Sequence, residues 1–247
     1  MNNKIGCLAR FSYYPYIHEV DFAKANGFDF LQIQYDRSGL LHENIHEQAK
    51  QIRDMNFPGI IHAILDINEI DEHAERLVDL ASYLMHKQII IHPICRSEKI
   101  ITSTIHKLSQ KIKFLLPKFE EKGIALFLEN NSKLDPVFTT TEEVRIIFSE
   151  NPSLEFVLDI AHIDNYVHLQ EMVTIKRPKL LHITDRKLEE IHNHVPIGKG
   201  NIDFDYIFRN ILVDYTGDII IEIYPEDNDI IFARDYLLQL FHLLHWN

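Results

Sequence analysis

Cysteine, tryptophan and glycine are scarce in this sequence. Its 247 residues include two cysteines, one tryptophan and eight glycines. Two cysteines, Cys7 and Cys95, cannot build a disulfide framework, and they form no CxxC pair. A disulfide-stapled fold and a cysteine-ligated zinc or iron–sulfur site are therefore disfavoured. Both cysteines lie near apolar runs, so we expect buried free thiols.

Long apolar runs and an excess of basic residues are also missing. No run approaches the roughly 20 apolar residues that span a bilayer, and the N-terminal stretch MNNKIGCLARFSYY has no long apolar segment after its lysine. Lysine and arginine total 25 against 37 acidic residues, which gives a net charge of −12. That charge opposes nonspecific contact with a polyanion or an anionic membrane. We expect a soluble cytoplasmic protein with neither nucleic acid nor a membrane as its partner.

Linker-like segments are absent as well. The nine prolines and eight glycines are scattered, and no Ser/Gly-rich or single-sign tract interrupts the chain. An apolar fraction of 46% is enough for a full core. These features indicate one domain over residues 1–247. A homo-oligomer is compatible with the sequence, which carries no signal of its assembly.

What the chain does contain is a regular alternation of apolar runs and amphipathic segments. Runs rich in Ile, Leu, Val and Phe are typical of buried parallel strands. Eight such runs predict strands at residues 4–10, 28–34, 59–65, 88–93, 123–130, 154–160, 179–184 and 218–224. Helical patterns occupy residues 18–27, 41–55, 72–85, 103–123, 140–151, 203–217 and 230–246.

Eight β-α units favour one architecture over another. Strict alternation implies parallel strands joined by right-handed crossovers. Eight units in a chain of about 250 residues are typical of a single eight-stranded (β/α)8 TIM barrel. A doubly wound open sheet is the alternative.

Six of the apolar runs end on a side chain that can bind a metal ion, and two further histidines follow closely. Because the carboxyl ends of barrel strands meet in one mouth, these residues should become neighbours. They are His62, His92, Glu129, Asp159, His182 and Glu222 at the run ends, with His162 and His194 just beyond. A mixed nitrogen and oxygen set suits a catalytic divalent ion such as Zn, Mn, Co or Mg.

The order of these fragments resembles a known superfamily. The series HAILDIN, IIIHP, LFLEN, LDIAH, LHITD, HVPIGKGNIDF and IIIEI, spread from about Gly27 to Glu222, is similar to the xylose isomerase-like TIM barrels. That group contains sugar and sugar phosphate isomerases and epimerases, and the AP endonucleases of the endonuclease IV type. The resemblance implies a metal centre formed by four residues: Glu129, Asp159, His182 and Glu222.

The nuclease members hold additional zinc ions, and the resemblance extends to the positions of their ligands. These positions are His62, His92, His162 and His194, which would bind either more metal or the substrate. Two departures count against a full trinuclear site. His192 stands where the nucleases have an aspartate, and LDIAHI lacks their cysteine and small-residue pattern.

The resemblance leads us to expect a divalent-metal-dependent isomerase or epimerase that acts on a small sugar or sugar phosphate. The reaction would pass through an enediolate, with Glu129 and Glu222 as metal ligands and as the acid/base pair. Three cations after the seventh strand, Arg186, Lys187 and Lys199, lie where barrel enzymes often bind phosphate. The alternatives are a multi-zinc phosphodiester hydrolase of the AP endonuclease type, and a metal-binding barrel without catalysis.

Some polar and aromatic residues near the predicted site receive other expectations. Asn130 and Asp185 should orient their neighbours or cap loops. An aromatic group after the first strand, Phe11, Tyr13, Tyr14 and Tyr16, could form a wall of a sugar site or could simply pack that loop. The remaining histidines, His86 among them, are expected on the surface.

Overall fold

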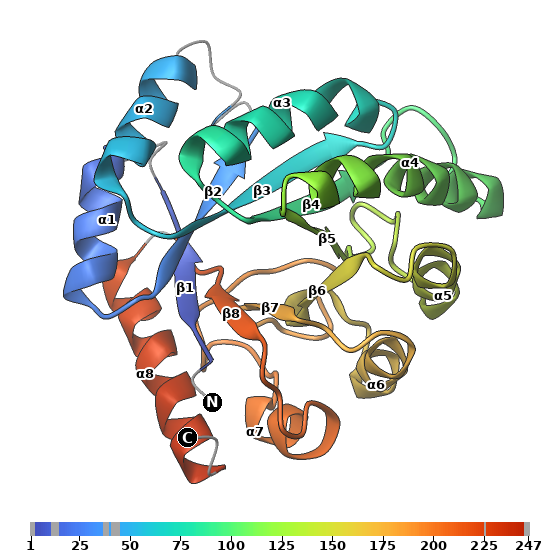
Figure 1. The fold of residues 1–247 in the computed structure, drawn as a ribbon. Coiled ribbons are helices and arrows are strands. Elements are labelled where there is room, and N and C mark those ends of the chain that lie inside the picture. The colour runs from blue at the N-terminus through green and yellow to red at the C-terminus, as the bar shows by residue number, and fades with distance from the viewer. Residues whose placement is uncertain (1–2, 11–14, 37–39, 41–44, 225, 245–247) are drawn as a thin grey trace.

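The described strands form a closed barrel. The computed structural model describes residues 3–10, 15–36, 40, 45–224 and 226–244. Each strand pairs in parallel with the next, and β8 pairs with β1 (Figure 1). The strands are β1 (Ile5–Leu8), β2 (Phe30–Tyr35), β3 (Gly59–Asp66), β4 (Gln88–Ile94), β5 (Ala125–Glu129), β6 (Glu155–Asp159), β7 (Leu180–Ile183) and β8 (Asp218–Ile221). The predicted (β/α)8 barrel is confirmed, and an open sheet is excluded.

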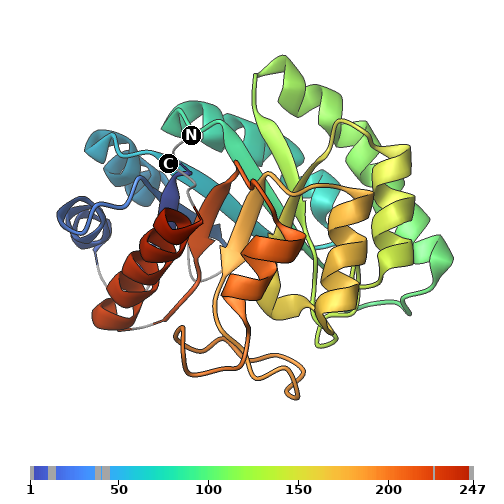
Figure 2. The same cartoon turned by 90° about the horizontal axis from the view of Figure 1, so that it is seen from below.

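Helices surround the strands on the outside of the barrel (Figures 1 and 2). The helices are α1 (Tyr16–Ala25), α2 (Ile45–Met55), α3 (Ile70–Leu84), α4 (Thr102–Glu121), α5 (Thr141–Glu150), α6 (Tyr166–Ile175), α7 (Phe204–Tyr206) and α8 (Asp227–Leu243). A 3-10 turn at Ile160–His162 follows β6, and a π-helical segment at Ile207–Ile211 follows α7. None of the described helices is both long and apolar enough to cross a membrane.

The sequence patterns missed one helix and overextended another. No helix was predicted between the sixth and seventh strands, although α6 lies there. Its signal is a cap, because the side chain of Asn165 accepts hydrogen bonds from the amides of Val167 and His168. The helix predicted at 203–217 ends at Ile211, and Asp214 then adopts a left-handed φ of 53°.

The barrel interior is layered by the two-residue repeat of its strands. Seven buried apolar side chains pack into one cluster inside the barrel: Phe30, Ile60, Ile90, Phe127, Val157, Leu180 and Ile220. Two residues after each of these seven side chains, on the same face of the sheet, the side chain is polar. These polar residues are Gln32, His62, His92, Glu129, Asp159, His182 and Glu222. The apolar layer therefore forms a dry floor beneath a polar layer at the carboxyl ends of the strands.

His86 is buried, contrary to the expectation that it lies on the surface. It stands between α3 and β4 and is 6% exposed. Its ring lies where a β-carbon at position 59 would be, so Gly59 is what allows it to pack against β3. Its Nε2 has no hydrogen-bond partner in the described structure. Burial lowers the pKa of His86 from 6.5 to about 4.

We predict that His86 makes the fold less stable in acid. Between pH 6.5 and about 4 the unfolded chain binds a proton at this residue while the folded chain does not, so stability falls as the pH falls. The loss from pH 8 to pH 5 should be about 2 kcal/mol. In His86→Gln, the change in the free energy of unfolding between pH 8 and pH 5 should therefore be about 2 kcal/mol smaller than in wild type. Urea unfolding at both pH values measures it.

The matched control is His18→Gln, because His18 is an exposed histidine on α1. It should leave the pH dependence of unfolding unchanged. An unaltered pH dependence in His86→Gln would contradict the prediction.

Candidate metal centre

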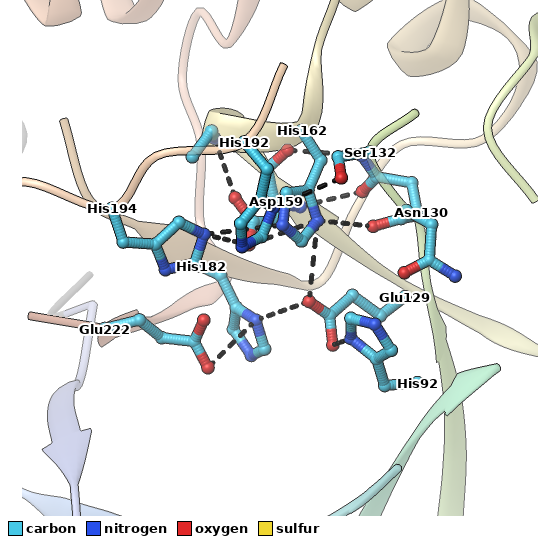
Figure 3. Close-up of polar contacts among 12 residues, drawn as sticks. His92, Glu129, Asn130, Ser132, Asp159, His162, His182, His192, His194 and Glu222 are labelled. Carbon is cyan, nitrogen blue, oxygen red and sulfur yellow. Dashed lines mark hydrogen bonds and ion pairs between the residues drawn. The ribbon is translucent and has the colours of Figure 1, made fainter. Parts of the chain in front are cut away.

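The carboxyl ends of the strands bring the predicted ligands together. Glu129 and Asp159 are the last residues of β5 and β6, His182 lies in β7, and Glu222 directly follows β8. Each offers one ligand atom, and these four atoms lie within 4.8 Å of one another. Figure 3 shows His182 between the two glutamates, with Nδ1 3.0 Å from Oε1 of Glu129 and 3.3 Å from Oε1 of Glu222.

Glu129 is the centre of this group. Its Oε2 lies 2.7 Å from Nε2 of His62 and 3.1 Å from Nδ1 of His92, while Oε1 faces His182. His62, His92 and Glu129 also form a second group of three convergent ligand atoms. One carboxylate is thus common to two candidate ligand groups.

Burial makes the charges of this group strongly interdependent. Burial alone would raise the pKa of Glu129, but the positive charges of His182, His92 and His62 hold it well below its usual range. Burial would lower the pKa of His182, yet Glu129 and Glu222 raise it to about 10. For Asp159, burial together with the charges of Glu222 and Glu129 raises the pKa to about 7. Burying three carboxylates this close together is costly unless a cation compensates their charge.

Asp159 fits a divalent ion particularly well. It is 0% exposed, and its Oδ1 accepts a hydrogen bond from the amide of Ala161. Its Oδ2 is buried and has no hydrogen-bond partner among the described residues. An ionised oxygen left in that state would be costly, whereas coordination would satisfy it. The donor set of three carboxylates and one imidazole suits a Zn, Mn, Co or Mg ion.

A histidine cluster lies beside this centre. His162, His192 and His194 form a third group of convergent ligand atoms. His162 donates through Nδ1 to the carbonyl of Asn130, 2.9 Å away, which leaves its Nε2 facing Nε2 of His194 at 3.4 Å (Figure 3). Nε2 of His194 also lies 3.8 Å from Oδ2 of Asp159. His192, which the sequence marked only as a departure from the nuclease pattern, is part of this cluster.

Asn130 and Asp185 have the supporting roles expected of them. The side chain of Asn130 bonds both the amide and the carbonyl of Asp159. The carboxylate of Asp185 accepts four backbone N–H bonds of 2.8 to 3.1 Å, from residues 186, 198, 200 and 202. A β-carbon at Gly200 would collide with this carboxylate, which explains the glycine there. Asp185 therefore shapes the loop that carries His192 and His194, which extends beyond the barrel in Figure 2.

The three cations predicted to bind phosphate have different surroundings. Arg186 is buried and donates to the carbonyls of Ile163 and Ile191, so its guanidinium holds the loop. Lys187 is exposed and lies 3.6 Å from Glu190, and Lys199 is exposed.

The aromatic group and the cysteines complete the list of sequence expectations. Tyr16 is buried, whereas Phe11, Tyr13 and Tyr14 lie outside the described residues. Both cysteines are free, Cys7 buried and Cys95 partly buried.

Gln32 is a site residue that the sequence patterns did not single out. It lies on β2, is 0% exposed and donates from Nε2 to Oε1 of Glu222. One sequence pattern could have identified it. Gln32 follows the apolar residue Phe30 by two positions, and each predicted ligand at a strand end follows an apolar residue in the same way.

Comparisons with known proteins agree with this architecture. Residues 20–240 match the family described as the xylose isomerase-like TIM barrel. No curated protein matches the chain. D-Allulose 3-epimerase from Methylomonas sp. superposes with a TM-score of 0.77 at 17% identity, over 96% of this chain and 98% of that one. L-Ribulose 3-epimerase gives 0.76 at 15%, over 99% and 96%. The IolI protein with a bound zinc atom gives 0.72 at 15%, over 96% and 97%.

At these identities the likeness to solved structures is one of fold. The family match, in contrast, is a match of sequence over most of the chain, and the chain belongs to the xylose isomerase-like TIM-barrel family.

Proposed function

We propose that this protein is a divalent-metal-dependent isomerase or epimerase of a small sugar or sugar phosphate. The observation that carries the proposal is the buried set of Glu129, Asp159, His182 and Glu222, whose ligand atoms converge within 4.8 Å. These four residues would hold the ion. When bound, it would stabilise negative charge that develops on the substrate's oxygen atoms.

The two glutamates are suited to moving a proton. They come from β5 and from the end of β8, on either side of His182 (Figure 3). The histidines around Glu129 keep the pKa of that carboxyl low, so it is ionised at neutral pH. Burial would raise the pKa of Glu222, but His182 lowers it overall. One carboxylate would remove the proton from the carbon beside the carbonyl and become a carboxylic acid, which could return that proton to the neighbouring position. For inversion, the second carboxylate would first take up a proton from solvent and then donate it to the opposite face.

The solvent side of the centre indicates where a substrate would enter. The side chains of Asp159 and His182 are 0% exposed, whereas those of Glu222, His92 and His194 are 11%, 14% and 26% exposed. A ketose would approach along these three residues. His92 and His194 would then bind its oxygens by hydrogen bonds.

Similar folds and the charge of the chain both support a small substrate. Two of the similar solved structures are sugar 3-epimerases. A net charge of −12 opposes a nucleic acid, whose binding depends largely on Lys and Arg contacts to phosphates. Arg186 and Lys187, two of the three cations near the mouth, already have protein partners.

Removing one glutamate ligand should weaken metal binding at the centre. Glu222→Gln and Glu129→Gln should each reduce bound metal, because an amide replaces a charged oxygen ligand. Elemental analysis of protein purified without chelator measures this. Glu226→Gln, an exposed glutamate at the start of α8, is the matched control and should keep wild-type metal content. Unchanged metal content in either ligand variant would refute the assignment.

The proposed proton transfer predicts exchange with solvent. Incubated in D2O with ketopentoses, ketohexoses and their phosphates, the metal-loaded protein should introduce deuterium beside the carbonyl of its substrate, as seen by NMR. Because proton transfer by a positioned side chain contributes about 10²- to 10⁴-fold, Glu222→Gln should slow exchange at least 100-fold. Glu226→Gln should exchange at the wild-type rate. Absence of exchange with every ketose tested would count against isomerase chemistry.

One observation favours a second candidate, a multi-metal phosphodiester hydrolase. Three further ligand groups accompany the main centre. His62 and His92 share Glu129 with it, His62 also converges with His182 and Glu222, and the His162, His192 and His194 cluster borders Asp159. Two or three ions there could activate a water for attack on a phosphodiester. The net charge of −12 disfavours a nucleic-acid duplex as the substrate, so a hydrolase of this kind would more readily act on a small phosphodiester.

Metal stoichiometry separates the two candidates. One ion per chain supports isomerisation, and two or three support hydrolysis. Under the hydrolase reading, His194→Ala should lower the metal count by about one and abolish cleavage of bis(p-nitrophenyl) phosphate. Under the isomerase reading the same variant keeps one ion. His18→Ala serves as the control, because His18 is an exposed histidine on α1 and is none of the candidate ligands.

A further inference from the structure

Gln32 lies inside the barrel at the level of the candidate ligands. Two residues before Gln32 on β2 is Phe30, and two residues before Glu222 is Ile220 on β8; both belong to the apolar floor. The side chain is fully buried, and Nε2 donates a hydrogen bond to Oε1 of Glu222. No other described side chain on β1 or β2 reaches a candidate ligand by a hydrogen bond that the structure records.

The orientation of the Gln32 amide follows from its partner. An amide nitrogen donates and a carboxylate only accepts, so Nε2 must face Glu222. The amide oxygen then points away from it, and this Oε1 is buried with no hydrogen-bond partner in the described structure. An unpaired buried acceptor is unfavourable for folding, and an apolar side chain at this position would avoid it.

The position of Glu222 explains why such a residue would be useful. Glu222 follows the last residue of β8, and its side chain is the most exposed of the four candidate metal ligands. His182 restrains it from one side, at 3.3 Å. The bond from Gln32 restrains the same oxygen from another direction, which limits the rotations open to the carboxylate.

We propose that Gln32 is a positioning residue that holds the Glu222 carboxylate in its metal-binding orientation. This inference rests on the proposed metal centre and extends it to β2. Groups that orient a metal ligand by a hydrogen bond commonly change metal affinity 10- to 100-fold when removed, which is about the effect expected here. On this proposal, the buried unpaired amide oxygen lowers the stability of the fold, while the amide nitrogen strengthens metal binding.

The test uses Mn²⁺ alone as the probe, with calorimetric titration of metal-free protein. Gln32→Leu, which keeps the volume and removes both polar atoms, should bind Mn²⁺ about 10- to 100-fold more weakly than wild type. Gln34→Leu is the matched control, because Gln34 lies on the same strand and face and has no side-chain hydrogen bond to a described residue. It should bind Mn²⁺ as wild type does.

A double-mutant cycle distinguishes positioning from a general structural effect. If Gln32 acts through Glu222, Gln32→Leu should cause no further loss of affinity in a Glu222→Gln background. The metal-free Gln32→Leu protein should also unfold at or above the wild-type temperature, because the variant removes the unpaired buried amide oxygen. Equal Mn²⁺ affinity in Gln32→Leu and wild type would overturn the inference, as would losses that add fully in the double variant.

These outcomes are separable from those of the proposed function. If wild-type protein binds no Mn²⁺ or other divalent ion, the metal centre itself fails. If wild type binds Mn²⁺ and Gln32→Leu binds it equally well, only the role of Gln32 fails.

Discussion

The burial of Glu129 is the constraint on which the candidate site depends. A carboxylate at the end of β5 is 1% exposed, and three imidazoles face its two oxygens within 3.1 Å. Asp159 and Glu222 add two more acidic groups nearby. Removing three carboxylates from water is tolerated only with compensating positive charge. The histidines provide part of it, and the unpaired oxygen of Asp159 marks where more is needed.

The strand repeat explains why so much of this arrangement could be predicted from sequence. In a barrel strand, residues i and i+2 point inward, so an apolar residue followed two positions later by a polar one signals a floor and a site above it. Ile60 with His62 and Ile220 with Glu222 follow this rule. Gln32 follows it too, but glutamine is not a common metal ligand, and its role becomes visible only through its contact with Glu222.

Features that depend on contacts between distant segments could not be predicted. His86 looks like a surface residue in sequence, and its burial depends on the space left at Gly59, 27 positions away in the chain. His192 joins a cluster because Asp185 gathers four backbone amides of its loop. The helix α6 lacked a clean apolar repeat, so its start was marked only by the cap at Asn165.

The two candidate reactions make incompatible demands on Glu129. If His62 and His92 hold a second ion with it, both of its oxygens are committed to metal, and it cannot also transfer protons. If a single ion is bound, Oε2 keeps its hydrogen bond to His62 and its close contact with His92, and the nearby imidazoles keep the carboxylate ionised as a base must be. Glu222 belongs to the four-residue centre in both cases. It also converges with His62 and His182 in a smaller group, and its side chain reaches solvent. The number of ions therefore determines the role of Glu129, whereas Glu222 and the residue that orients it serve either chemistry.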